Sequence, residues 1–183
     1  LGRRSKLPIV SLLSTIFIEI WRGVPLITVL FMASNMFPLF MPEGVNFDKL
    51  IRALIGVMFF SAAYLAEVVR GGLQAMPKGQ YEASQAAGLT YWKMMALIIL
   101  PQSLKIVIPA IIGSFIALFK DTTLVLIIGL FDFLGIIQFV GTYPDWLGFS
   151  HEGYVFAAAI FWVFCFGMSR YSQRLEKKLD TGH

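Results

Sequence analysis

The stretch Ile106–Leu130 reads IVIPAIIGSFIALFKDTTLVLIIGL, an apolar run whose charged residues are the neighbours Lys120 and Asp121. A helix needs about 20 apolar residues to cross the hydrocarbon core of a bilayer, because lipid offers no hydrogen-bond partner to an open backbone. This stretch is long enough, and a helix satisfies its backbone internally. The sequence therefore predicts a membrane-spanning helix here, interrupted at Lys120-Asp121.

The composition of the whole chain supports this prediction. Of its 183 residues, 57% are hydrophobic and 14% are charged, and the mean hydropathy is +0.74. A soluble domain averages about a quarter charged residues, because its water-facing surface needs them. The chain is therefore predicted to be an integral membrane protein. Its net charge of +4 is too modest to indicate nucleic-acid binding.

Further apolar segments lie on both sides of this stretch. We expect an all-α polytopic bundle with four spans, over residues of about 22–41, 50–69, 106–130 and 153–171. The first contains the uncharged run Val24–Met41 and is preceded by the apolar stretch Ile9–Ile18. The aromatic-rich segment Phe131–Glu152 is expected to be a long outer loop, and 71–105 a long inner loop.

The basic residues indicate the orientation, since Lys and Arg in short loops favour the cytoplasmic side. If the N-terminus is inside, the inner segments carry Arg3, Arg4, Lys6, Arg70, Lys78, Lys93, Lys105, Arg170, Arg174, Lys177 and Lys178. The outer segments then carry the basic residues Lys49 and Arg52, and the acidic residues Glu43, Asp48, Asp132, Asp145 and Glu152. This bias places both chain ends and the loop 71–105 in the cytoplasm.

The inner loop contains a short predicted helix with a face of small residues. Tyr81–Ala87 is a run of helix formers, and Gly88 is a typical left-handed stop. Ala83, Ala86 and Ala87 share one face by their i, i+3, i+4 spacing. Small residues let another backbone approach closely, as when a helix lies in a groove of a partner. The alternative is a surface helix-turn-helix that merely joins two spans.

A second helix is expected directly after the first. Thr90 is placed to cap a helix over Tyr91–Leu100, which Pro101 ends or kinks. This helix leads straight into the span at 106–130, so the loop is predicted to be joined to the bundle without a flexible linker.

The loop resembles a known family motif. Glu82-Ala83-Ser84, three residues, Gly88, nine residues and Ile98-Ile99-Leu100-Pro101 are similar to the EAA loop of ABC importer permeases, written E-A-A, three residues, G, nine residues, I-x-L-P. The departure is Ser84 for the second Ala. Other blocks resemble the polar amino acid (histidine/glutamine/glutamate-type) permeases, namely Arg22–Leu26, Ala63–Gly72, Pro77–Gln80 and Lys120–Leu124.

The resemblance implies the type I ABC importer permease fold and the transport of polar amino acids across the bacterial inner membrane by alternating access. Its implied partners are a cytoplasmic ATP-binding subunit, a second permease subunit (the same or a sister chain), a periplasmic or surface solute-binding protein and the amino acid. The implied ATPase-coupling residues are Glu82, Ala83, Ser84, Ala86, Ala87 and Gly88. Family members usually have a further span before the region where this chain begins. Because Leu1 is also not Met, we expect an N-terminally truncated piece.

The sequence contains no recognisable nucleotide-binding, catalytic or metal-binding motif. It contains no Walker A pattern, so the chain is expected neither to hold ATP nor to be an enzyme. The histidines are His151 and His183 and the single cysteine is Cys165, which do not have metal-ligand spacing. We expect no metal and no cofactor. The basic segment Arg170–Lys178 is expected to anchor the last span and to contact membrane lipid.

Two interpretations are open for the charges in the third span. An ionisable residue inside a span costs about 3 kcal/mol or more unless it is paired or wet. Lys120, Asp121 and Thr122 either lie at the substrate path or gate, or have a structural role. In the structural interpretation Lys120 reaches toward the interface, Asp121 is paired and Thr122 restarts a broken helix.

The alternative function is an ion-coupled secondary transporter or a channel subunit, and a third possibility is a structural or signalling membrane subunit. Either would explain the spans. Neither gives a reason for an Ala-faced inner helix with this long, fixed spacing to Ile98-Ile99-Leu100-Pro101.

Overall fold

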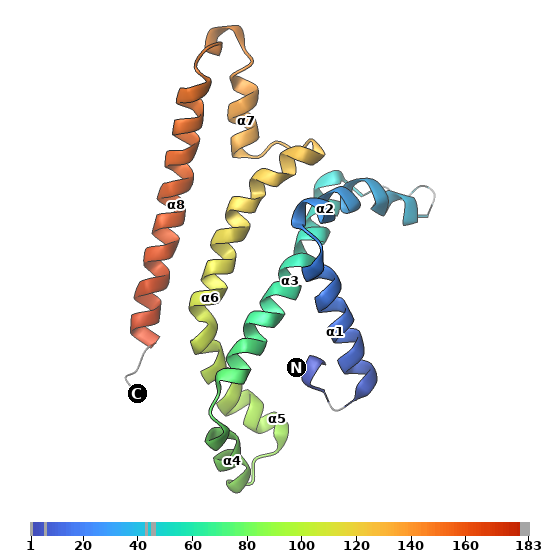
Figure 1. Cartoon of the computed structure of the whole chain (residues 1–183), viewed down its shortest axis with the longest axis vertical. Helices are drawn as coiled ribbons and strands as arrows, with labels where there is room; N and C mark the ends of the chain where they lie inside the picture. The colour runs from blue at the N-terminus through green and yellow to red at the C-terminus, as the bar shows by residue number, and fades with distance from the viewer. Residues whose placement is uncertain (1, 6, 43, 45–46, 180–183) are drawn as a thin grey trace.

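The computed structural model of the chain describes residues 2–5, 7–42, 44 and 47–179 (Figure 1). This part of the chain is helical and contains no strand, which confirms the predicted all-α class. The elements are η1 (Gly2–Arg4), α1 (Pro8–Gly23), α2 (Leu26–Phe31), the π-turn η2 (Met32–Met36), η3 (Phe37–Phe40), α3 (Lys49–Ala75), α4 (Lys78–Ala86), α5 (Tyr91–Met94), the π-turn η4 (Met95–Ile99), α6 (Leu100–Asp121), η5 (Thr122–Ile128), α7 (Phe133–Val140), η6 (Pro144–Trp146) and α8 (Ser150–Leu179). Lys6, Glu43 and His183 lie outside the described residues.

Three helices are long and apolar enough to cross a membrane. They are α3, the continuous helix Tyr91–Ile128 formed by α5, η4, α6 and η5, and α8. In Figure 1 α6 lies between α3 and α8, and it packs against both. The expected spans at 50–69 and 153–171 lie within α3 and α8, and nearly all of the span at 106–130 lies within the continuous helix.

The segment expected to be one span over 22–41 is bent. α1 and Leu26–Phe40 meet at an angle of 100°, and they reach the length and hydropathy of a span only as a pair. Pro25 has no N–H, and its ring disfavours helical backbone in the residue before it. Val24 is accordingly extended, with φ −110° and ψ 132°. The apolar run therefore begins earlier than expected, in α1, and changes direction at Pro25.

A small apolar core holds the bent segment against the end of α3. It consists of Leu26, Val29, Leu30, Ala53 and Ile128. Gly56 of α3 allows the close approach, since a Cβ there would lie 3.1 Å from a methyl of Val29 and 3.2 Å from Ala33 Cβ. The second half of the bent pair thus packs on both α3 and η5 (Figure 1).

The connection between α6 and α8 contains a helix where an outer loop was expected. α7 and η6 lie within the segment Phe131–Glu152. Asp132 occupies the N-cap of α7, where its Oδ1 accepts a hydrogen bond of 2.8 Å from the Gly135 N–H. A short apolar helix inside an aromatic-rich stretch has no clear periodicity, which is why the composition alone suggested an irregular loop.

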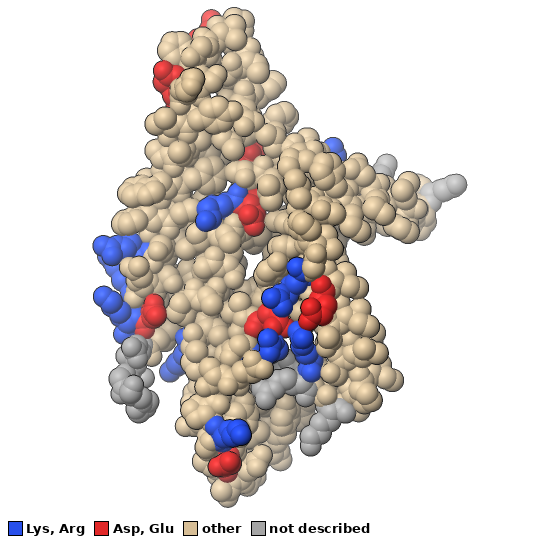
Figure 2. Space-filling model, viewed as in Figure 1, with Lys and Arg blue, Asp and Glu red and all other residues tan. Residues whose placement is uncertain are grey.

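Charged side chains are confined to a few patches of the visible surface (Figure 2). Acidic residues mark the end of the molecule at the α7–α8 connection, and basic residues gather at the C-terminal end of α8. A mixed patch of both signs lies over α1 and α3. The acidic and basic side chains thus gather at different places on this face of the molecule.

Candidate coupling site and substrate path

The C-terminal end of α3 and the N-terminal end of α6 are joined by a packed body, residues 76–99, which we call the coupling module. Its core is formed by Leu73, Met76, Met94, Met95 and Ile99. The half-buried ring of Tyr81 packs on this core, and its hydroxyl donates to the Leu73 carbonyl at 3.3 Å. The loop is therefore not a loose linker, because it shares one core with the ends of two spanning helices.

The second helix of the module runs without a stop into α6. The π-turn Met95–Ile99 precedes Pro101, which lies in the first turn of α6. A π-turn widens the helix locally, and Pro101 supplies no N–H to the ladder. Thr90 occupies the N-cap of α5, but its side chain makes no capping hydrogen bond. The direct connection expected from the sequence is thus present, whereas the expected Thr90 cap is not.

Gly88 ends the first helix of the module. Its φ is +74°, a left-handed conformation that glycine adopts at low cost. The Gly88 N–H donates to the Gln85 carbonyl at 2.9 Å, and the Leu89 N–H donates to the Ser84 carbonyl at 3.2 Å. These bonds satisfy the last carbonyls of α4. The predicted stop at Gly88 is confirmed.

The small residues of α4 point away from the core of the module. Glu82, Ala83, Ala86 and Ala87 are all exposed. Ser84, in contrast, is 3% exposed, and its hydroxyl donates to the Gln80 carbonyl at 2.6 Å. Of the expected coupling residues, Ser84 therefore faces the chain itself, because it lies about 100° around the helix from Ala83.

The spanning helices α3 and α6 cross closely just above the module. A Cβ on Gly72 would lie 2.7 Å from the Ser103 carbonyl oxygen and 2.5 Å from a methyl group of Val107. Ser103 is 1% exposed and its hydroxyl donates to the Leu100 carbonyl at 3.1 Å. A side chain at Gly72 would therefore force the two helices apart at this crossing.

The residues expected at the substrate path lie where α6 changes to a tighter helix. α6 ends at Asp121, and the 3-10 helix η5 begins at Thr122. The Thr122 hydroxyl donates to the Phe119 carbonyl at 2.8 Å. Lys120 and Thr122 are exposed, and Asp121 is half-buried. The interruption expected at Lys120-Asp121 is thus a change of helix type rather than a gap.

A groove lies between α3 and α6 beside this change. It has a volume of about 290 Å³ and is lined by Phe60, Ser61, Tyr64, Leu65, Ser114, Phe115, Ala117, Leu118 and Asp121. Asp121 is the one charged residue of this lining. The groove therefore combines aromatic and apolar walls with two hydroxyls from serine and one carboxylate.

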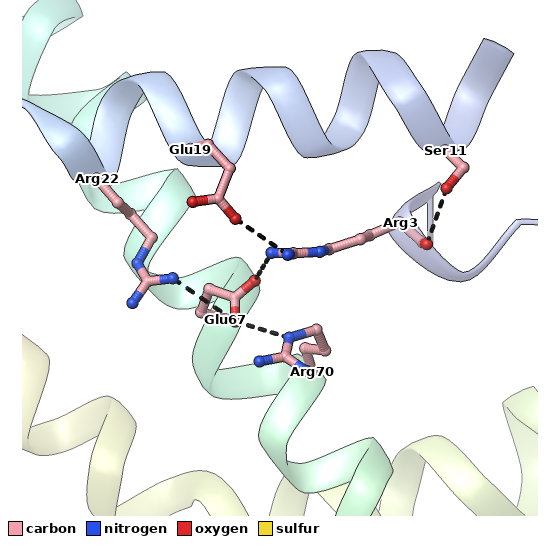
Figure 3. Close-up of polar contacts among 6 residues, drawn as sticks. All are labelled: Arg3, Ser11, Glu19, Arg22, Glu67 and Arg70. Atoms are coloured by element: carbon pink, nitrogen blue, oxygen red, sulfur yellow. Dashed lines mark hydrogen bonds and ion pairs between the residues drawn. The ribbon is translucent and has the colours of Figure 1, made fainter. Parts of the chain in front are cut away.

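A cluster of charged side chains, the Glu67 cluster, joins α1, α3 and η1 (Figure 3). Its centre is the Glu67 carboxylate, which is 11% exposed. Arg3 Nη1 lies 2.6 Å from Glu67 Oε1, and Arg70 Nε lies 2.7 Å from Oε2. Arg22 Nη1 lies 3.7 Å from Oε2, and Arg3 Nη2 also contacts Glu19 Oε1 at 3.0 Å. Both carboxylate oxygens of Glu67 are thus occupied by guanidinium groups.

Sequence spacing revealed only part of this cluster. The pair Glu67–Arg70 has the i, i+3 spacing of neighbours on one helix face. Glu19 and Arg22 have the same spacing, but Glu19 pairs with Arg3 instead. Arg3 lies 64 residues from Glu67, so no local pattern signals their contact. Among the described residues the structure brings together no group of three His, Cys, Asp or Glu side chains that could hold a metal ion.

Comparison with known proteins assigns the family. Residues 1–181 match the family model described as binding-protein-dependent transport system inner membrane component. The inner membrane amino-acid ABC transporter permease protein YhdY of Escherichia coli is 66% identical over 182 residues, which are 100% of this chain and 50% of that protein. The glutamate/glutamine/aspartate/asparagine transport system permease protein BztC of Rhodobacter capsulatus is 56% identical over 184 residues, covering 100% of this chain and 42% of that protein. The chain thus spans about half the length of these relatives or less.

A solved structure shares the fold. The crystal structure of an amino acid ABC transporter with histidines matches with a TM-score of 0.84 and 28% identity, over 97% of this chain and 80% of that chain. The resemblance seen in the loop motif is thereby confirmed, as is the expected multi-pass inner-membrane location. The chain belongs to the family of binding-protein-dependent transport system inner membrane components and has the fold of an ABC importer permease.

Proposed function

We propose that this chain is part of a permease subunit of an ATP-driven ABC importer that carries polar amino acids inward by alternating access. ATP would be hydrolysed on a separate cytoplasmic subunit, and a second permease subunit and an external solute-binding protein would complete the importer. The family supports this proposal, as does the amino acid transport for which YhdY and BztC are named.

The proposed topology has four crossings. These are α1 together with Leu26–Phe40, then α3, then Tyr91–Ile128, and finally α8. The loop 71–105 lies in the cytoplasm, where it meets the ATPase. The basic end of α8, with Lys177 and Lys178 in its last turn, lies at the inner surface and contacts anionic lipid.

The coupling module carries the proposal. Glu82, Ala83, Ala86, Ala87 and Gly88 form an exposed face of mostly small residues on α4, suited to lie in a groove of the ATPase. Ser84 supports this face from beneath. Because the module shares a core with Leu73 of α3 and Ile99 before α6, a displacement of α4 moves both helices. Two packings of one bundle, biased by nucleotide, then give alternating access.

The substrate path is proposed to run along the groove between α3 and α6. The Asp121 carboxylate can attract the ammonium group of an amino acid, since opposite charges attract strongly away from bulk water. Lys120 lies next to it at the outer end of α6, and Thr122 begins the 3-10 helix. A change from α-helix to 3-10 helix within one continuous helix is typical of a hinge, and a hinge at this point would suit a gate.

The test is reconstitution of the full-length subunit in liposomes with its ATPase and solute-binding protein. We expect uptake of labelled glutamate, glutamine, aspartate or asparagine that requires ATP, with little uptake of apolar amino acids. Uptake that follows an ion gradient and needs no ATP would contradict the proposal and favour a secondary transporter. An Asp121→Asn variant, which keeps the shape of the side chain, is expected to lose uptake while retaining ATPase binding.

A further inference from the structure

The Glu67 carboxylate has more arginine partners than are needed to neutralise its charge. A single guanidinium would neutralise the Glu67 carboxylate, and Arg70 already does so from the same helix at 2.7 Å. Arg3 and Arg22 are added from outside α3, from η1 and from the last turn of α1. The two added arginines make Glu67 the point at which separate parts of the chain are tied together (Figure 3).

The ion pairs of the described residues all involve Glu67 or Arg3. Arg3 is itself held in place, because its carbonyl accepts a hydrogen bond of 3.1 Å from the Ser11 hydroxyl of α1. Arg22 also lies over the ring of Tyr64, with its guanidinium carbon 5.6 Å from the ring centre. The cluster is therefore held from both α1 and α3 by more than charge alone.

α1 also packs against α3 through aromatic rings, at a point on α3 about two turns before Glu67. The Trp21 and Phe59 rings are stacked with centroids 5.3 Å apart, and Phe17 meets Phe59 edge-on at 6.0 Å. The aromatic contacts and the Glu67 cluster thus use the same turns of α1 but two places along α3. Contacts at two places along α3 resist a rotation of α1 against it.

The cluster also lies close to the coupling module. Glu67 is six residues, or about 9 Å of helix, before Leu73, whose side chain is part of the core of the module. A motion that enters α3 through Leu73 therefore reaches Glu67 within two helical turns. From there the arginine contacts pass it to α1, and through α1 to the bent segment Leu26–Phe40.

We infer that Glu67 is a positioning residue for energy coupling, which holds α1 to α3 so that motion of the coupling module moves both helices together. This inference rests on the proposed importer function. Glu67 would then raise the amount of amino acid taken up per ATP hydrolysed, in addition to stabilising the bundle. Without the carboxylate, α3 would move while α1 lagged behind.

The first test compares two isosteric variants in the reconstituted importer. Glu67→Gln keeps the shape of the side chain but removes the charge, and its amide N–H₂ group would face a guanidinium. We expect the amount of amino acid taken up per ATP hydrolysed to fall by about fivefold or more. Glu19→Gln is the matched control, because Glu19 lies in the same cluster but is 57% exposed and contacts Arg3 alone. It should leave the ratio nearly unchanged.

The second test removes one partner of Glu67. Arg3→Gln takes away the contacts of η1 with Glu67 and Glu19, and it should also lower the uptake per ATP. If Glu67→Gln does not assemble, Arg3→Gln replaces it, since Arg70 and Arg22 then still neutralise Glu67. A wild-type ratio in an assembled Glu67→Gln or Arg3→Gln variant would overturn the inference.

The third test measures the motion directly. Spin labels at Leu12 of α1 and Met58 of α3, both well exposed, report the distance between the two helices in a cysteine-free background. In the wild type the distance between the labels should stay the same when ATP binds. In Glu67→Gln the distribution of distances should broaden. A shift in the wild type would show that the helices move separately and would contradict the inference.

These outcomes separate the inference from the function on which it rests. If the wild-type protein shows no ATP-dependent uptake, the proposed function itself is wrong. If the wild type takes up amino acids with ATP but the variants keep its ratio, the importer stands and the role of Glu67 does not.

Discussion

The connection between α3 and α6 and the connection between α6 and α8 both join membrane-crossing helices, but they are packed in opposite ways. In the first, Leu73, Met94 and Ile99 are buried in a shared core. In the second, Trp146 is 56% exposed and Leu147 is 65% exposed. The outer connection also borders an open cavity of about 700 Å³ between α7, η6 and α8.

This difference indicates different mechanical roles for the two ends. A densely packed body transmits displacement, because packed side chains interdigitate and resist compression. A connection with few buried contacts has low local stability and opens easily. In the proposed importer the α3–α6 connection is the inner one and is suited to pass motion on, and the α6–α8 connection is the outer one and is suited to change shape. Changes that loosen the inner connection should be severe, and changes in the outer one mild.

Truncating the most buried side chain of the inner connection should have the largest effect. Ile99 is 0% exposed, so Ile99→Ala leaves a cavity and is expected to cost about 2–5 kcal/mol of unfolding free energy. Thermal unfolding of the purified subunit measures this loss. Leu97→Ala removes a comparable side chain that is 69% exposed and serves as the control. Equal losses in the two variants would contradict a packed inner core.

Crowding the crossing of α3 and α6 should come next. Gly72→Ala places a Cβ against the Ser103 carbonyl oxygen, and backbone must move to relieve the contact. We expect a loss of about 1–3 kcal/mol in unfolding free energy, together with reduced uptake. The adjacent Gly71→Ala is a direct control, since nothing lies within 4 Å of a Cβ there. Tolerance of Gly72→Ala would mean that the helices do not need this close crossing.

Replacing the helix stop should mainly affect coupling. Gly88→Val forces a β-branched residue into the left-handed region, at about 1–2 kcal/mol, and should lower the uptake per ATP while the protein still inserts. Gly88→Asn tolerates this backbone conformation but adds bulk to the exposed face. Recovery in Gly88→Asn would assign the defect to backbone strain, and continued uncoupling would assign it to the face that meets the ATPase. Normal coupling in Gly88→Val would contradict both.

The outer connection should tolerate the loss of a large side chain. Trp146→Ala removes an exposed ring that meets Phe149 with centroids 6.4 Å apart. We expect a change of less than about 0.5 kcal/mol in unfolding free energy, measured in the same thermal assay. A loss as large as that of Ile99→Ala would remove the contrast between the two ends.

Features with a local cause could be predicted from the sequence. The apolar runs gave the all-α class because lipid leaves a backbone few alternatives. Gly88 was identified as a left-handed stop from its place after a run of helix formers, and it has a φ of +74°. The Glu67–Arg70 pair has the i, i+3 spacing that brings side chains together on one helix face.

Features that depend on three-dimensional packing could not. Hydropathy measures how apolar a segment is but not its direction, so the 100° bend at Pro25 was hidden inside one apolar run. The contact of Arg3 with Glu67 has no sequence signal, because its partners are far apart in the chain. Ser84 was grouped with the small residues of α4 by type, but its burial depends on which side of the helix meets the core of the module.

The crossing at Gly72 and Ser103 divides the helix Tyr91–Ile128 unequally. Tyr91 lies 12 residues, or about 18 Å, to one side of Ser103, and Asp121 lies 18 residues, or about 27 Å, to the other. If the helix tilts about this fixed point, the crossing acts as a fulcrum with the longer arm toward Asp121. In the proposed importer, a small push at Tyr91 would then be enlarged about 1.5-fold at Asp121.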